Sequence, residues 1–523
     1  MVVGSGPSAV ACAWALAAQG FRPLVVDAGR RLEPEREQAL QSALSPDGLD
    51  PSFVGELERS FPVDVDRLPL KPAFGSLFPY AVDEPLLPTR ADAVGLVSSL
   101  ALGGLSNVWG GAMLPYRDRD LHGWPFGVAE LAEHYRSTFG FVPLAGEHDR
   151  LEELFPLYGE PQPLEPTAQI EALLGKLRET SDDLRRAGVA WGRSRLAVSA
   201  GTGKLGESCR YTGLCMYGCP YGSIYNAAAT LRALVEGGRV DYRPGCVVER
   251  LEEASGAVRV RVSALGGGAP ETLSAERVFL ACGAVESTRV VLESLEQYDR
   301  PVPLLENSYF TLPLLALRRR ARVGRGLGRN TLAQIFLELD DPELSAHGVH
   351  FQVYGYNDLM LRALTARLHA GERPVERMLQ PLLGRLLYGQ GYLHSDDSPR
   401  LSVELVREHS GRLLVISPGA GAEAARRASA VVRKLGSLRR LTGIQPLAPM
   451  LQVWPQGKAF HVGGSLPMRE RPGELESDLL GRPTGFRRVH VVDASVLPSL
   501  PATTITLSVM ANAQRIAAEH DQD

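Results

Sequence analysis

Short apolar runs alternate with a longer helical pattern at the start of this chain. Met1–Val3 is apolar and leads into Gly4, Val10–Gln19 is rich in alanine, and Pro23–Val26 is a second apolar run. The apolar runs have the length of strands, and the stretch between them has the length of a helix. Strands that alternate with helices are typical of parallel sheets. The opening residues therefore predict a strand, a turn, a helix and a second strand.

The same order of elements returns further along the chain. Arg277–Ser287 reads as a buried strand, a glycine turn and the start of a helix. The C-terminal part repeats this order, with an apolar run at Val489–Ser495 and a helix at Thr506–Glu519. Between residues 301 and 450 the pattern changes to alternating strands, such as Val349–Tyr354, and amphipathic helices, such as Ala422–Leu441.

These patterns predict an α/β fold, α+β overall, in which the two ends of the chain build one domain. Residues 1–300 and 451–523 are expected to form a Rossmann-like dinucleotide-binding domain. Residues 301–450 are expected to form an inserted substrate-binding domain of antiparallel sheet plus helices.

Composition and charge exclude several classes of protein. The chain has 523 residues, of which 44% are hydrophobic and 22% charged, and its net charge of −4 does not favour a nucleic-acid or membrane-surface partner. It contains no run of the ~18 apolar residues that a transmembrane helix needs, and it does not start with a basic signal-peptide region. A cytoplasmic location is therefore expected. Three of the 6 cysteines lie close together, which argues against a scattered disulfide framework.

The first turn carries the pattern of a dinucleotide site. Its pattern is GxGxxA: the first glycine allows a tight turn, the second lets the backbone approach a pyrophosphate, and the alanine permits close packing of helix on strand. The turn also presents a helix N-terminus to the phosphates. Asp27, at the end of the second strand, is placed to hold ribose hydroxyls. The alternative is a chance glycine turn in an ordinary α/β protein. The residues concerned are Gly4, Gly6, Pro7, Ser8 and Ala9.

Four motifs in order make the chain resemble the glucose-methanol-choline family of flavoprotein oxidoreductases. They are GSGPSA with VVDAG, GGLSNVWGG, VFLACGAVESTRVVLES, and HVGG followed by VVDASVLPS. The resemblance spans nearly the whole length and implies that the dinucleotide is FAD. A small hydroxylated molecule is then the expected substrate, oxidised at a CH–OH group.

The resemblance also implies which residues hold FAD. Asp27 would bind the adenosine ribose, Asn107–Gly110 would lie along the flavin ring, and Asp493 and Ala494 would contact the ribitol and the ring. For each glycine-rich segment the alternative is a tight surface turn. The other expected cofactor residues are Gly103, Gly104, Ser106, Asn107, Val108, Trp109, Gly110, Ala281 and Gly283.

His461 stands at the family's base position, before Val462-Gly463-Gly464. Oxidation of an alcohol needs a base, and an imidazole with its ordinary pKa near 6.5 is largely neutral at neutral pH. A hydrogen-bonded core histidine is the alternative. The family usually has Asn or His eleven residues after the aspartate of the VVDAS segment, where this chain has Thr504. Threonine can donate one hydrogen bond to a substrate oxygen but cannot act as a base. His461 then either works with this weaker partner or receives help from the inserted domain.

Cys209, Cys215 and Cys219 form a Cx5CxxxCP array. Thiolates at this spacing suit a compact metal or iron–sulfur centre, and a proline after the last cysteine is typical of ferredoxin-like runs. The array resembles that of the family's sugar and polyol dehydrogenases with a three-iron, four-sulfur (3Fe-4S) cluster. A cluster would pass electrons to an external one-electron acceptor. A structural cysteine loop is the alternative, and the other cysteines are interpreted as core residues.

Strand alternation places Gln352 with Tyr354, and Gln390 with Tyr392, on common faces. Amides and aromatic rings suit a sugar, cyclitol or polyol, although a solvated strand face gives the same pattern. The basic run 318–322 could receive an anionic substrate or acceptor, or be ordinary surface. The main hypothesis is a dehydrogenase with a cysteine-bound relay. An oxygen-using oxidase with structural cysteines and a non-catalytic flavin-binding scaffold are the alternatives.

Overall fold

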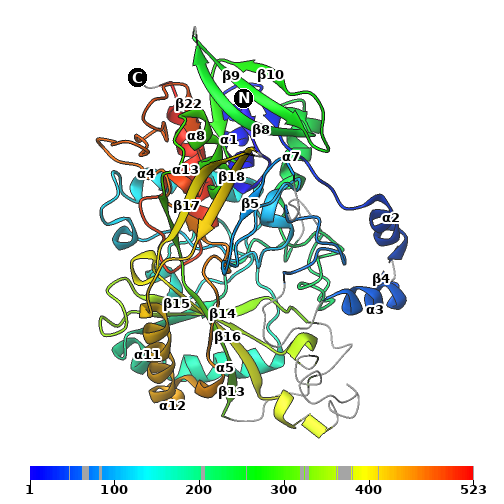
Figure 1. Ribbon diagram of the computed structural model, residues 1–523. Helices are drawn as coiled ribbons and strands as arrows, with labels where there is room; N and C mark the ends of the chain where they lie inside the picture. Colours follow the sequence, from blue (N-terminus) through cyan, green and yellow to red (C-terminus); the bar gives the residue numbers. More distant parts are fainter. Residues whose placement is uncertain are drawn as a thin grey trace.

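The computed structural model describes residues 1–45, 48–61, 70–81, 85–201, 207–254, 256–317, 323, 329–360, 362, 378–379, 381–409 and 411–521. Two regions follow one another along the long axis of the molecule (Figure 1). One contains the first and last strands of the chain, and the other contains a large antiparallel sheet flanked by α11 (Glu423–Ser437) and α12 (Arg439–Thr442).

A parallel sheet with the strand order β22-β11-β1-β2-β7 forms the first region. Val2 and Val3 of β1 pair with β11 on one side and with β2 on the other. The bounds are β1 (Val2–Val3), β2 (Leu24–Val26), β7 (Asp241–Arg243), β11 (Val278–Leu280) and β22 (Val489–Val491). Strands from both ends of the chain thus share one sheet, as the repeated strand–helix order predicts.

Helices pack on this sheet and bury its apolar residues. α1 (Pro7–Ala18) packs against α13 (Thr506–Glu519), which also packs against α4 (Ala129–Phe141). α8 (Ala284–Ser294) follows β11, and α7 (Ala227–Glu236) precedes β7. The antiparallel strands β8 (Cys246–Ala254), β9 (Ala257–Ala264) and β10 (Glu271–Ala275) lie beside α8. Their apolar residues join the same core.

A further sheet with the order β21-β12-β17-β18-β5 contributes to that core. Its strands are β5 (Thr89–Arg90), β12 (Val302–Glu306), β17 (Leu401–Glu408), β18 (Gly411–Ser417) and β21 (Val462–Gly463). Val302, Leu401 and Leu414 belong to the core cluster of the first region. The strands β12, β17 and β18 of the 301–450 segment therefore pack with the dinucleotide-binding region.

The second region is built on a sheet with the order β19-β13-β16-β15-β14-β6, and β20 also pairs with β13. Helix α5 (Ala168–Glu179) and helix α6 (Ser181–Arg186) pack near α12, and a separate apolar core lies between helices and sheet. The strands are β6 (Val189–Arg193), β13 (Tyr309–Ala316), β14 (Ala333–Leu339), β15 (Val349–Tyr354), β16 (Leu386–Leu393), β19 (Ile444–Pro446) and β20 (Gln452–Val453). The expected α/β class with an antiparallel second sheet is confirmed, although β6 comes from well before residue 301.

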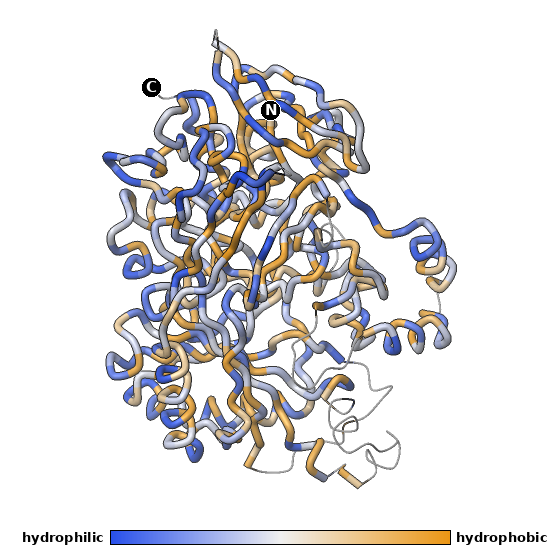
Figure 2. The backbone as a smooth tube through the Cα atoms, in the orientation of Figure 1, coloured by the Kyte–Doolittle hydropathy of each residue, from blue (hydrophilic) through white to orange (hydrophobic). Residues whose placement is uncertain are grey.

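The segment 34–60 projects from the body of the molecule (Figure 1). It contains α2 (Pro34–Ala43), β3 (Leu44–Ser45), β4 (Gly48–Leu49) and α3 (Pro51–Ser60). Most residues of α2 are hydrophilic and only Ala43 is buried (Figure 2). Among the described residues, none of the helices has the length and apolar character that crossing a membrane requires.

Candidate functional site

One cavity of about 1160 Å³ runs from the first turn of the chain to the strands of the second sheet. It brings together residues that the sequence places hundreds of positions apart. Of the predicted site residues, it is lined by Gly4, Gly6, Pro7, Ser8, Asp27, Gly104, Ser106, Val108, Trp109, Gly110, Ala281, Gly283, Gln352, Tyr354, Gln390, Tyr392, His461, Asp493, Ala494 and Thr504. Ala9, Gly103, Asn107 and the cysteines Cys209, Cys215 and Cys219 are outside this lining as the described residues define it.

The first turn has the geometry that a bound dinucleotide needs. Gly4 has a φ of +105°, and a Cβ there would collide with the carbonyl oxygen of Ala281. Gly6 is different, because a Cβ on it would meet nothing within 4 Å. Its side of the turn is open to the cavity at the N-terminus of α1. The open space and the unpaired N–H groups of a helix start fit a pyrophosphate.

Asp27 is held at the end of β2 by two neighbours. Ser5 Oγ donates to Asp27 Oδ2 at 2.6 Å, and the Tyr242 hydroxyl donates to the same oxygen at 3.3 Å. Burial raises the pKa of Asp27 to about 6. The carboxyl group lines the cavity and is positioned before any ligand arrives.

The second glycine segment forms a 3-10 turn, Gly104–Asn107, with its own side chains turned inward. Asn107 Nδ2 donates to the carbonyl oxygens of Leu102 and Gly104, and Asn107 Oδ1 accepts from Asn226 Nδ2 at 2.8 Å. Ser106 Oγ donates to Gly103 O at 2.5 Å. These bonds shape the turn, and Gly104 to Ser106 and Val108 to Gly110 line the cavity.

Asp493 performs a structural task at the start of α8. Its Oδ2 accepts from Gly283 N at 3.0 Å and from Ser287 Oγ at 2.5 Å, and its Oδ1 accepts from Ser495 at 2.6 Å. The side chain thus joins two neighbouring strand ends, β11 and β22. The side-chain oxygens of Asp493 are occupied by these bonds, and Ala494 lies next to them on the cavity wall.

His461 lies where the two halves of the cavity meet. Burial, followed by the influence of His350, lowers the pKa of His461 to about 4. Its ring stacks on that of Tyr392, with centroids 5.3 Å apart and planes 26° apart. Nδ1 is buried and has no hydrogen-bond partner among the described residues. The imidazole is therefore neutral at neutral pH and is held by stacking.

Thr504 also faces the cavity and is 3% exposed. Its Oγ1 accepts a hydrogen bond from Leu114 N at 3.0 Å. This bond uses a lone pair and leaves the hydroxyl hydrogen available as a donor. Thr504 can therefore hold an oxygen atom in the cavity.

Polar side chains of three adjacent strands form a continuous series that we call the amide chain. It consists of Glu338, His350, Gln352, Tyr354, Gln390 and Tyr392. Gln352 is the cross-strand partner of Gln390, and His350 is the partner of Tyr392. The Tyr354 hydroxyl lies 2.6 Å from Gln352 Oε1 and 2.9 Å from Gln390 Oε1.

Glu338 and His350 are members of the amide chain that the sequence analysis missed. Glu338 Oε1 lies 2.6 Å from His350 Nδ1, and His350 Nε2 lies 3.0 Å from Gln352 Nε2. The strand alternation that groups Gln352 with Tyr354 also places His350 on the same face, so His350 could have been found from the sequence. Glu338 lies opposite His350 on β14, and only the strand register shows this.

The cysteine array lies in a loop beside the cavity. All three thiols are free, and burial raises the pKa of Cys209 to about 11. Lys71, whose pKa burial lowers to about 8, interacts electrostatically with Cys215 and Cys219. Within the described residues the three thiols do not form a ligand set with all sulfur atoms inside 4.8 Å. The basic run 318–322 lies outside the described residues.

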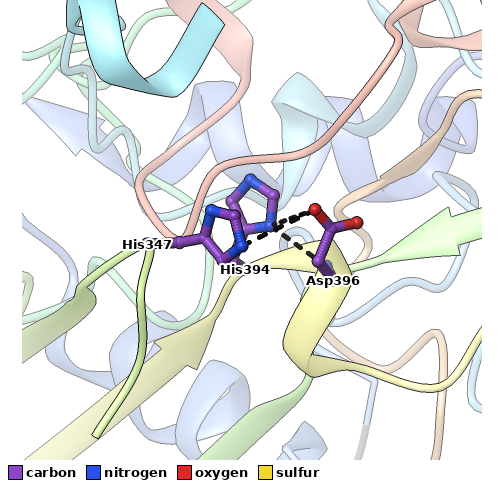
Figure 3. Close-up of side chains that lie close together, drawn as sticks. All are labelled: His347, His394 and Asp396. Atoms are coloured by element: carbon purple, nitrogen blue, oxygen red, sulfur yellow. Dashed lines mark hydrogen bonds and ion pairs between the residues drawn. The ribbon is translucent and has the colours of Figure 1, made fainter. Parts of the chain in front are cut away.

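One group of potential metal ligands does meet that distance within the described part of the chain, and it lies apart from the cysteines. Figure 3 shows His347, His394 and Asp396, with both imidazoles directed at the carboxylate. The two rings stack with centroids 3.9 Å apart. His394 Nδ1 accepts a hydrogen bond from Asp396 N at 3.0 Å. Because this bond uses the nitrogen lone pair, His394 serves as a helix cap and is not free to bind a metal through Nδ1.

Comparison with known proteins supports the fold. A family model described as an NAD(P)-binding Rossmann-like domain matches residues 2–32. The structure of pyridoxine 4-oxidase from Mesorbium loti is similar over 99% of this chain and 98% of that chain, with a TM-score of 0.60 and 18% sequence identity. The curated protein sequences contain no match. The predicted dinucleotide-binding unit is thus confirmed, and the whole architecture is that of a known oxidase structure.

Proposed function

We propose that this protein oxidises a CH–OH group of a small hydroxylated molecule with FAD as its cofactor. The observation that carries the proposal is the position of His461. A neutral, half-buried imidazole lines the same cavity as the glycine turn and the strand end of Asp27. The architecture shared with pyridoxine 4-oxidase is consistent with this chemistry.

The residues of the first region fit FAD. Gly6 and the start of α1 would bind the pyrophosphate, Asp27 would bind the ribose, and Val108–Gly110 with Ala494 would lie along the ring system. When bound there, FAD supplies the acceptor for the hydride that leaves the alcohol carbon.

His461 and Thr504 would act on the alcohol itself. Nδ1 of His461 is buried, so Nε2 is the nitrogen that a substrate can reach from the cavity, and Nε2 accepts the hydroxyl proton as the base. The Thr504 hydroxyl donates to the alcohol oxygen and orients it. Stacking on Tyr392 keeps the imidazole plane fixed.

A sugar, cyclitol or polyol is the substrate class that we propose. The support is the amide chain, whose tyrosines offer rings for stacking and whose amides offer hydrogen bonds. An aromatic alcohol such as pyridoxine is the second candidate, because Tyr309 and Trp454 also line the cavity. These two substrate classes differ in how many of their hydroxyl groups need a hydrogen-bond partner on the cavity wall.

The cysteine array leaves two routes for the electrons. In the proposed route a 3Fe-4S cluster on Cys209, Cys215 and Cys219 passes them to an external one-electron acceptor. Met216 lies within the array and lines the cavity, which supports proximity of the loop to the flavin site. In the alternative route molecular oxygen is the acceptor and the cysteines are structural. Iron analysis of protein purified without oxygen separates the routes: about three irons per chain support the cluster, and absence of iron refutes it.

Anaerobic titration tests the main proposal. Purified holoprotein is mixed with D-glucose, D-fructose, myo-inositol, pyridoxine and benzyl alcohol, and the flavin absorption band is followed. Bleaching by at least one alcohol is the expected result. Bound FAD that none of a broad panel of alcohols reduces would instead favour a non-catalytic scaffold, and protein that does not bind FAD would refute the proposal.

A further inference from the structure

At Tyr354 the amide chain has two hydrogen-bond acceptors, the amide oxygens of two glutamines, but only one hydrogen to share between them. The hydroxyl group lies within hydrogen-bond distance of both Gln352 Oε1 and Gln390 Oε1, and a phenol has a single hydrogen to donate. The oxygen and nitrogen of an amide are assigned from the hydrogen bonds around them. One of the two amides therefore has to turn its nitrogen toward Tyr354.

The buried end of the chain decides which amide turns. Glu338 is 4% exposed and His350 is fully buried. A carboxylate only accepts hydrogen bonds, so His350 Nδ1 carries a hydrogen and donates it to Glu338. His350 Nε2 lies 3.0 Å from the amide nitrogen of Gln352, and because an amide nitrogen can only donate, Nε2 accepts this bond. The oxygen of Gln352 is left to accept from Tyr354.

Arginine side chains lie near the carboxylate of Glu338. Glu338 interacts electrostatically with Arg117 and Arg195, and Arg195 is 1% exposed. These guanidinium groups compensate the buried carboxylate.

The hydrogen count then fixes Gln390. Because Tyr354 donates to Gln352, Gln390 has to donate to Tyr354 through its amide nitrogen. The Tyr392 hydroxyl lies 3.3 Å from the same amide atom and can accept its second hydrogen. The carbonyl oxygen of Gln390 then points away from Tyr354. On that side Gln390 makes no hydrogen bond to the described residues and lines the cavity.

We propose that Glu338 and His350 fix the direction of the amide chain and so turn the carbonyl oxygen of Gln390 into the cavity, where it accepts a hydrogen bond from a second hydroxyl of the substrate. The inference rests on the proposed function for the identity of the substrate. Glu338 and His350 are positioning residues, and Gln390 determines specificity. The favoured substrates are alcohols with a second hydroxyl group.

The protonation of His350 can be tested without turnover. In holoprotein with 15N-labelled histidine, the signals of His350 are identified by their loss in His350→Gln, or by their shift in Glu338→Gln if the first variant does not fold. We expect a protonated Nδ1 and an unprotonated Nε2, and a mixture of tautomers in Glu338→Gln. An imidazolium or an Nε2–H tautomer in the wild-type protein overturns the proposal.

Binding of two matched probes tests Gln390. Cyclohexanol and cyclohexane-1,2-diol are titrated into oxidised holoprotein, and the Kd is read from the change in flavin absorption. We expect the diol to bind about 3- to 10-fold more tightly, the value of one hydrogen bond. Gln390→Leu should remove this preference. Gln445→Leu is the matched control, because Gln445 is an amide on β19 that is not in the described lining of the cavity, and it should keep the preference.

Failure of this inference and failure of the proposed function remain distinguishable. Equal Kd values, or binding of neither probe, overturn the inference. Failure of every alcohol to reduce the flavin refutes the proposed function, and the tautomer and the ratio of Kd values still decide the direction of the chain.

Discussion

The two halves of the cavity are built by different means. In the first region the wall is mostly backbone: Gly4, Gly6 and Gly283 leave room that a side chain would occupy, and Asp493 holds two strand ends together. In the second region the wall is mostly side chain, and the amide chain joins β14, β15 and β16 across their faces. The shape of a wall made of backbone depends on whether side chains would collide with it. The shape of a wall made of hydrogen-bonded side chains depends on the strand register and on which atoms carry hydrogens.

This difference has a consequence for substitutions. An added methyl group in the first region either meets backbone atoms that cannot move, as at Gly4, or enters the space of the cavity, as at Gly6. A changed side chain in the second region alters which atoms donate and accept while the strands stay paired. The first kind of change should affect folding or FAD binding, and the second should affect substrate binding. His461 stands between the two regions, so its substitution should affect neither FAD binding nor substrate binding.

The largest expected effect is therefore that of His461→Ala. Loss of the base should slow flavin reduction by roughly 10² or more, in line with general-base contributions. FAD content should not change. The control is His490→Gln, because His490 is buried and bonded to Leu480 O outside the cavity lining. Stopped-flow reduction by an active alcohol is the measurement, and an equal rate in His461→Ala would remove His461 from the mechanism.

Next in size is the contrast between Gly4→Ala and Gly6→Ala. In Gly4→Ala the methyl group collides with Ala281 and the φ of +105° is unfavourable, so the variant should be unfolded or lose several kcal/mol of stability. In Gly6→Ala nothing obstructs the methyl group, so thermal unfolding of the apoprotein should be nearly unchanged while FAD affinity falls about tenfold or more. Equal stability of the two variants would contradict a backbone-built wall.

Thr504→Val should have an intermediate effect. The Leu114 N–H group would lose its acceptor in a buried position, which costs about 1–3 kcal/mol of stability. Flavin reduction should also slow, because the alcohol oxygen loses a donor. Thr504→Ser keeps the hydroxyl and is the matched control. A Val variant as stable and as fast as the Ser variant would show that the hydroxyl serves neither purpose.

Glu306 should give a smaller effect that is confined to a pH window. Burial raises its pKa from 4.5 to about 7, so the folded protein keeps this proton where the unfolded chain has lost it. The contribution of Glu306 to stability should therefore fall as pH rises from about 4.5 to 7 and stay lower above. Because Asp27 and His461 still titrate in Glu306→Gln, the pH dependence of that variant should differ from wild type only by the missing contribution of Glu306, while exposed Glu343→Gln should behave as wild type. Urea midpoints at pH 5 and pH 8 measure it, and equal pH dependence of all three proteins would refute it.

The smallest expected change is in the pH profile of flavin reduction. Because the pKa of His461 is lowered to about 4, the base is unprotonated from pH 5 upward. The rate constant of reduction should therefore be level between pH 5 and 8 and should fall only near pH 4. A break near 6.5 that disappears in His461→Ala would show that the cavity does not shift this pKa.

The sequence analysis was most successful where a local motif carries the geometry. The turn at Gly4, the strand at Val349–Tyr354 and the helix at Thr506–Glu519 are all where the pattern predicts them. These elements depend on glycine placement and on hydrophobic period, which are properties of short segments. The roles of the predicted site residues stay predictions, although the structure places most of them on one cavity.

Other features depend on which strands become neighbours. Glu338 could not be paired with His350 from the sequence, because β14 and β15 meet through an antiparallel register that short segments do not encode. β6 joins the second sheet from a distant position for the same reason. The hydrogen bonds from Gly283 and Ser287 to the side chain of Asp493 join β11 and β22, and no pattern in the sequence signals them; the contact of Asp493 with the cofactor stays a prediction.

The order of strands in the first sheet also bears on how the protein is made. β11 pairs with β1, which is synthesised well before it, and with β22, which is synthesised well after it. During translation the long segment between β11 and β22 has to leave the ribosome before β22 and α13 can dock. Until then β11 is an uncovered sheet edge, open to mispairing with other nascent chains. Exposure of that edge during synthesis of the intervening segment is a consequence of joining distant segments in one sheet.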